Sequence, residues 1–99
     1  MRTVTESQAR AVRQILVEEC GMSPEDRYCS FVRTITIAEP RLACTEYRFM
    51  GALGFGGKFR NNGNRNNTPY VDCYPESETP ERLRMIEAAN VRLAELFGT

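Results

Sequence analysis

Residues 44–74 read CTEYRFMGALGFGGKFRNNGNRNNTPYVDCY, and this stretch decides the fold. It contains most of the aromatic residues and most of the glycines of the chain, and its residues 60–67 are rich in asparagine and arginine. Residues 45–50 alternate in character, with Tyr47 and Phe49 on one face and Glu46, Arg48 and Met50 on the other. This alternation predicts a half-buried strand that ends at the following glycine.

A second extended segment is predicted over residues 52–60, and Asn62-Gly63 is the expected tight turn of a loop over residues 61–67. The register that follows pairs Phe55 with Tyr70 and places Gly54 opposite Val71. Glycines inside this segment indicate a bulge or the close approach of another part of the chain. A third strand is predicted over residues 70–74. Because Pro69 has no N–H, it is expected to lie at the start of this strand or at a sheet edge.

The segments on either side of this stretch have helical patterns. A helix is predicted up to residue 20, with an N-terminal capping box at Thr3–Glu6 or Thr5–Gln8 and a C-terminal cap at Gly21. Its buried positions follow the i, i+3, i+4 spacing and are Ala9, Val12, Ile15, Leu16 and Cys20.

A second helix is predicted from Ser23 to residue 34, because serine, proline and two acids form a typical helix start. Residues 34–37 also fit a short strand, and Pro40 ends the segment in either case. A last helix is predicted from Thr79 to Phe97, with Pro80 in its first turn. Its inner stripe is Leu83, Ile86, Ala89, Asn90, Leu93 and Phe97.

The predicted fold is a single compact α+β domain over residues 1–99, with the order ααβββα. Two N-terminal helices precede a small three-stranded antiparallel sheet, and the C-terminal helix packs on one face of that sheet.

The charge distribution constrains the function. The formal net charge is zero, but residues 31–74 carry six cations against three acids, and the flanking segments are acidic. A protein that binds nucleic acid with its whole surface is usually strongly basic. The first residues lack the apolar core of a secretory signal, and no segment has the run of apolar residues that would cross a membrane, so a cytoplasmic location is predicted.

The four cysteines, at positions 20, 29, 44 and 73, include no C-x-x-C pair, which argues against an ordinary zinc site. Cys20, Cys29 and Cys73 occupy amphipathic positions and are predicted to be buried free thiols. A four-cysteine zinc site assembled from distant positions is the alternative. We expect neither a metal nor a cofactor.

Enzymatic activity is not expected. The glycine-rich segment before Lys58 lacks the spacing of a phosphate-binding loop, and Phe59 follows where that loop needs serine or threonine. The chain contains no histidine to act as a general base for a serine or cysteine nucleophile.

The basic hairpin is the candidate binding site, and its predicted contact residues are Arg48, Lys58, Arg60, Asn62, Arg65 and Tyr70. Arginine beside tyrosine is typical of protein-binding hot spots, so we expect a small protein-binding module. In size and class alone it is comparable to the inhibitors that phages and other mobile elements use against host nucleoprotein complexes such as CRISPR effectors.

Two alternatives use the same region. Arginines interleaved with aromatic rings also suit single-stranded RNA or DNA, where cations bind phosphates and rings stack on bases. The strand over residues 70–74 is a candidate edge for homodimer formation across a two-fold axis.

Overall fold

The computed structural model describes residues 4–24, 47–54, 56–65 and 68–98. Over these residues the chain forms two α-helices, three strands and two short 3-10 turns. In chain order the elements are α1 (Glu6–Cys20), β1 (Tyr47–Met50), η1 (Ala52–Gly54), β2 (Gly56–Arg65), β3 (Thr68–Cys73), η2 (Pro75–Ser77) and α3 (Pro80–Leu96).

Both helices begin at a side-chain cap. At the start of α1 the Thr5 hydroxyl accepts the Gln8 N–H at 3.1 Å, and the Gln8 side chain accepts the Thr5 N–H at 3.1 Å. At α3 the Thr79 hydroxyl accepts the Arg82 N–H at 3.1 Å. The caps satisfy backbone donors that have no partner inside a helix, and each such cap contributes about 1 kcal/mol. Of the two predicted capping boxes of α1, the one at Thr5–Gln8 is confirmed, and so is the predicted start of α3 at Thr79.

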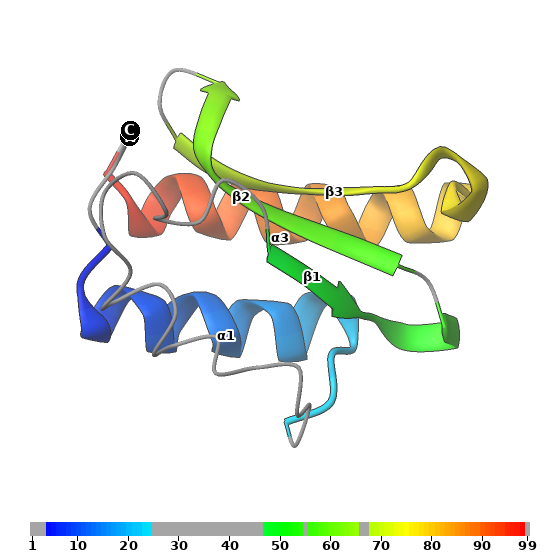
Figure 1. Cartoon of the computed structure of the whole chain (residues 1–99), viewed down its shortest axis with the longest axis horizontal. Coiled ribbons are helices and arrows are strands. Elements are labelled where there is room, and N and C mark those ends of the chain that lie inside the picture. The colour runs from blue at the N-terminus through cyan, green and yellow to red at the C-terminus, as the bar shows by residue number, and fades with distance from the viewer. Residues whose placement is uncertain (1–3, 25–46, 55, 66–67, 99) are drawn as a thin grey trace.

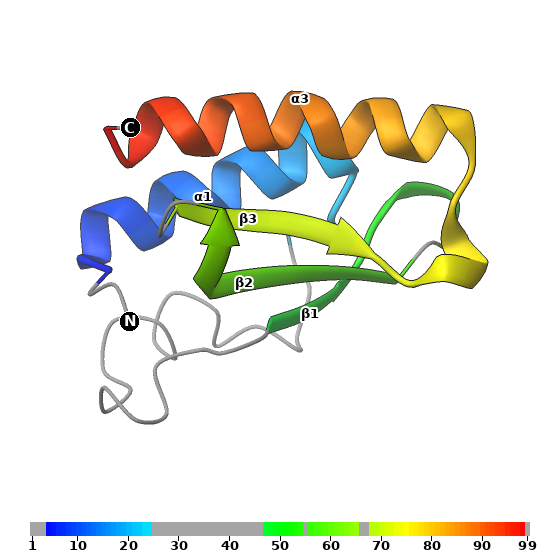
Figure 2. The same cartoon turned by 90° about the horizontal axis from the view of Figure 1, so that it is seen from above.

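The helices form one layer and the sheet forms the other. The sheet is antiparallel with the order β1-β2-β3, and α1 and α3 lie antiparallel to each other on the same face of it (Figures 1 and 2). An ion pair of 2.7 Å between Arg92 and Glu18 joins the two helices. The hydrogen bond from Gln14, followed by that from Arg92, lowers the pKa of the Glu18 carboxyl. The predicted α+β class, the antiparallel sheet and the C-terminal helix are confirmed.

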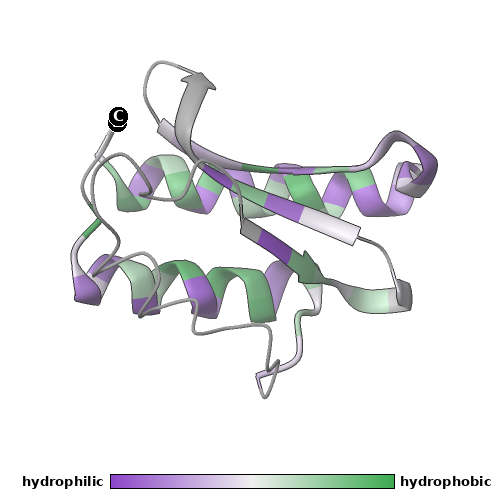
Figure 3. Cartoon of the chain, viewed as in Figure 1, coloured by the Kyte–Doolittle hydropathy of each residue, from purple (hydrophilic) through white to green (hydrophobic). Residues whose placement is uncertain are grey.

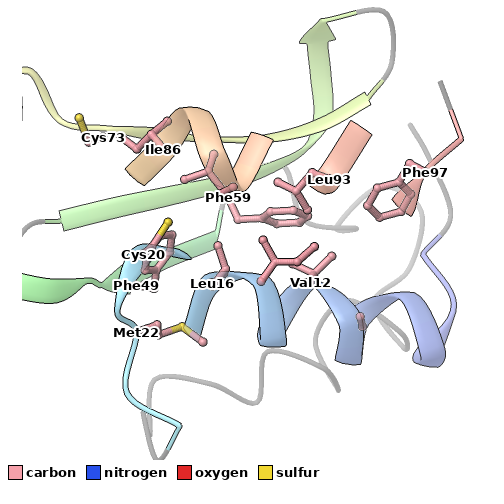
Figure 4. Close-up of a cluster of buried hydrophobic side chains, with 14 of the residues drawn as sticks. Val12, Leu16, Cys20, Met22, Phe49, Phe59, Cys73, Ile86, Leu93 and Phe97 are labelled. Atoms are coloured by element: carbon pink, nitrogen blue, oxygen red, sulfur yellow. The ribbon is translucent and has the colours of Figure 1, made fainter. Parts of the chain in front are cut away.

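The core fills the space between the two layers. Hydropathy alternates along both helices, as expected for amphipathic segments (Figure 3). All five positions predicted for the inner stripe of α1 are buried. Figure 4 shows Phe59 pointing from β2 toward Val12 of α1 and Leu93 of α3, and Phe59 has no exposed surface. Phe59 therefore lies where β2, α1 and α3 meet.

The inner stripe of α3 is confirmed at Ile86, Ala89, Leu93 and Phe97, which are buried. The prediction is wrong at Leu83, whose side chain is 43% exposed. Leu83 belongs to the first turn of α3, which lies beside η2 and past the end of β3 (Figure 1). Periodicity places Leu83 on the inner face of α3, but none of the three described strands extends beneath that turn to cover the side chain.

The predicted extended structure over residues 52–60 is wrong in its first part. Ala52–Gly54 forms the turn η1, and Gly54 adopts a φ of 72°. Met50 pairs with Gly56 across the antiparallel strands β1 and β2, so the chain must reverse between these two residues. Left-handed backbone at Gly54 helps to make that reversal, and glycine adopts it with little strain.

The predicted turn at Asn62-Gly63 is also wrong. Strand β2 continues to Arg65, which pairs with Thr68, and residues 66–67 connect the two strands. Because β2 continues to Arg65 and the pairing then shifts register between Arg60 and Arg65, Val71 lies opposite Phe59 instead of Gly54. The irregular stretch of β2, between Arg60 and Arg65, faces the part of β3 that contains Pro69. Proline has no N–H to donate to a regular ladder of hydrogen bonds between strands.

Most of the predicted second helix, and all of the alternative strand over residues 34–37, fall within residues 25–46 and lie outside the described residues. Neither α1 nor α3 has the length and hydrophobicity that a transmembrane helix requires, and this statement covers only the described parts of the chain.

Candidate functional site

The candidate site is the outer face of the sheet, meaning the face turned away from α1 and α3. Side chains alternate between the two faces along each strand, and Phe49, Phe59 and Val71 are buried on the helix side. The positions between them point outward and are exposed or half-buried. The described residues of this outer face are Arg48, Met50, Lys58, Arg60, Tyr70, Asp72 and Tyr74.

The structure brings four of the six predicted site residues together in two pairs. Arg48 of β1 lies opposite Lys58 of β2, and Arg60 of β2 lies opposite Tyr70 of β3. Arg65 pairs with Thr68 beyond the register shift, and Asn62 lies within the irregular stretch that precedes it. The predicted cluster is therefore divided, and Arg48, Lys58, Arg60 and Tyr70 form the part that lies on the regularly paired strands.

Tyr74 is a site residue that the sequence prediction missed. The Lys58 Nζ atom lies 4.5 Å from the centroid of the Tyr74 ring, and the Arg48 Cζ atom lies 5.9 Å from it. A cation above an aromatic ring at such a distance contributes about 0.5–1 kcal/mol at an exposed site. The ring also lies against Gly56, where an added Cβ would be 3.0 Å from Tyr74 Cδ2. The sequence could have indicated Tyr74 as a site residue, because alternation over residues 70–74 places it on the same face as Tyr70 and Asp72.

A hollow of about 360 Å³ opens beside this ring, and we call it the Tyr74 hollow. It lies at the end of the sheet next to the β1–β2 connection, and its lining is mainly apolar. The lining residues are Arg48, Phe49, Met50, Gly56, Gly57 and Tyr74. Met50 is 50% exposed and adds an accessible apolar side chain to the lining, of a type that is enriched at protein interfaces.

Gly57 makes room for the Phe49 ring beneath the hollow. A Cβ added at Gly57 would fall inside the contact distance of three ring carbons of Phe49, its cross-strand partner. We expect Gly57→Ala to lower the free energy of unfolding by about 1–3 kcal/mol, because the buried ring must move. The double variant Gly57→Ala/Phe49→Leu should lose less than the sum of the two single losses. Strictly additive losses in urea denaturation would contradict this contact.

The described residues of the outer face carry a net positive charge. Among the described side chains of this face, Arg48, Lys58 and Arg60 are cations, and Asp72, which lies opposite Lys58, is an anion. The Asp72 side chain accepts the Cys73 N–H at 2.8 Å, so one of its oxygens is engaged at the edge of β3. The face therefore favours anionic groups around the Tyr74 hollow.

Asn90 of α3 covers the free edge of β3. Its amide oxygen accepts the Val71 N–H at 2.7 Å, and its amide nitrogen donates to the Val71 carbonyl at 3.0 Å. Two residues further along, the Cys73 N–H is taken by Asp72, and two residues earlier Pro69 has no N–H. These features protect an edge strand from pairing with another chain. They make the alternative of a homodimer paired through residues 70–74 less favourable.

Cys20 and Cys73 are buried free thiols, as predicted, whereas Cys29 and Cys44 lie outside the described residues. Burial, and to a smaller extent the charge of Glu19, raises the pKa of Cys20 to about 12. Burial also raises the pKa of Cys73. Within the described segments, no group of three cysteine, aspartate or glutamate side chains could hold a metal ion.

We expect Cys20 to resist alkylation by iodoacetamide at pH 8, because the thiolate is the reactive species and this thiol stays protonated well above that pH. Mass spectrometry of the peptide that contains Cys20 should show modification only after the protein is unfolded in urea. Rapid labelling of Cys20 in the native protein would contradict its burial in the core.

Comparison with known protein families, with curated proteins and with solved structures finds no match to this chain.

Proposed function

We propose that the chain is a non-enzymatic protein-binding module that contacts its partner through the outer face of the sheet. The observation that carries this proposal is the Tyr74 hollow, where an aromatic ring, two cations and an exposed methionine meet on one surface. Tyrosine, arginine and methionine are enriched at protein interfaces, and an anchor held in place before binding loses little entropy on association. The specific case to be tested is an inhibitor of a host or defence nucleoprotein complex.

The arrangement of Tyr74 favours a protein over single-stranded nucleic acid. A base would stack on an open ring face, whereas the Lys58 ammonium already lies above the Tyr74 ring. Nucleic acid remains the second candidate because Arg60 and Tyr70 are paired on the same face.

The test is affinity capture from a lysate of the source organism, with a matched pair of variants. Met50 and Val91 are each 50% exposed, the first on the outer face and the second on α3. Met50→Glu and Val91→Glu add the same charge at the same exposure. We expect a specific protein, retained after nuclease treatment, to be captured by the wild type and by Val91→Glu but lost with Met50→Glu.

Equal recovery of the partner by both variants would place the contact surface elsewhere. Recovery that disappears after nuclease treatment would favour the nucleic-acid candidate, and binding to oligonucleotides should then weaken steeply with salt. Circular dichroism and thermal melting of both variants establish that each is folded before its capture is compared.

A further inference from the structure

The Tyr74 hollow has features that restrict the chemistry of its occupant. We infer that it receives an acidic peptide segment of a partner protein, with an apolar side chain in the hollow and a neighbouring carboxylate at Lys58 and Arg48. This inference rests on the proposed function and deepens it by naming the class of partner.

The apolar requirement comes from the lining. Met50, Phe49, Gly56 and Gly57 line the space together with Tyr74. A volume of about 360 Å³ lies near the lower end of the range for ligand pockets, and it suits one large side chain better than an extended ligand. A fully hydrated ion such as phosphate would leave this apolar surface uncovered.

The anionic requirement comes from the rim. Lys58 Nζ and Arg48 Cζ both lie within 6 Å of the Tyr74 centroid, so two positive charges lie close to the ring that lines the hollow. An ammonium carries three donors, and the ring engages it from one direction only. A carboxylate can approach from the other side and form a charge-assisted hydrogen bond. Charge complementarity therefore selects glutamate or aspartate beside the apolar residue.

The probe is a short fluorescein-labelled peptide rich in glutamate with one central phenylalanine. We expect it to bind, measured by fluorescence anisotropy, and to shift the backbone amide signals of Met50, Lys58 and Tyr74 in an NMR titration. A peptide with glutamine in place of glutamate, and one with alanine in place of the phenylalanine, should each bind at least roughly tenfold more weakly.

Lys58→Glu and Arg84→Glu form the matched pair of variants for this test. Both reverse one cation, but Arg84 is an exposed residue of α3 outside the hollow. Lys58→Glu should weaken the acidic peptide by roughly tenfold or more, and Arg84→Glu should leave its affinity nearly unchanged. Lys58→Gln, which keeps a polar side chain without charge, should show an intermediate loss and guards against a folding defect in the reversal.

Three results would overturn the inference. The first is equal affinity for the glutamate and glutamine peptides, or no binding of either at millimolar concentration. The second is stronger binding of a single-stranded oligonucleotide with the same dependence on Lys58. The third is a dimer in light scattering that dissociates with Met50→Glu, since a second copy would then fill the hollow.

The two proposals fail in different ways. If Met50→Glu abolishes capture of a protein while the acidic peptide does not bind, the outer face is the binding surface but its partner is not an acidic segment. If capture is indifferent to Met50→Glu, the proposed function fails at its site, whatever the peptide does.

Discussion

Replacing Phe59 by alanine is expected to lower the free energy of unfolding by about 3–5 kcal/mol. The side chain has no exposed surface and extends from the central strand β2 toward both helices (Figure 4). Its removal would take contacts from α1 and α3 together and leave a cavity that neither helix can close without losing other contacts. For a domain of this size, whose total stability is typically about 5–15 kcal/mol, such a loss is a large fraction.

Urea denaturation followed by circular dichroism measures this loss. Phe59→Leu is the matched control, since it retains most of the apolar volume and should lose much less than the alanine variant. Val91→Ala, at an exposed position of α3, should change stability by no more than about 0.5 kcal/mol. A loss below about 1 kcal/mol for Phe59→Ala would show that the sheet and the helices do not share a core at this residue.

Replacing Asn90 by alanine is expected to have the second large effect. The variant would leave both the N–H and the carbonyl of Val71 without their hydrogen-bond partner, at a cost of about 1–3 kcal/mol. It would also open the free edge of β3 at its centre, so we expect association that increases with protein concentration.

Hydrogen exchange at the Val71 amide separates this mechanism from a general loss of stability. In Asn90→Ala the Val71 amide should exchange faster than global unfolding accounts for, and light scattering should detect association. Glu87→Ala, at an exposed position of the same helix, is the control and should change neither readout. A monomeric Asn90→Ala variant with an unaltered Val71 amide would contradict the role of Asn90 as an edge cover.

Asn90 and Tyr74 illustrate how far sequence patterns extend toward function. Helical spacing predicts that Asn90 lies on the inner face of α3, and this is confirmed, but spacing does not indicate that its amide bonds to a strand. The outward direction of Tyr74 follows from alternation along β3. Its role depends on Gly56 and Lys58, which become its neighbours only through the register of β2 with β3.

The chain sequence by itself determined the features that depend on neighbours close in sequence. The caps at Thr5 and Thr79, the buried stripe of α1 and the alternation of β1 all follow from contacts within a few residues, where propensity and periodicity act directly. The predicted placement of Arg48 and Phe49 on opposite faces of β1 is confirmed for the same reason.

Only the tertiary structure decided the features that depend on distant partners. Asn62-Gly63 has the stronger local turn signal, yet β2 continues past it, because pairing with β3 and packing of Phe59 against both helices outweigh a turn preference. Leu83 is exposed because the sheet ends before the first turn of α3. Cross-strand register is set by long-range packing, which no local pattern encodes. This register divided the predicted site and brought Tyr74 next to Lys58.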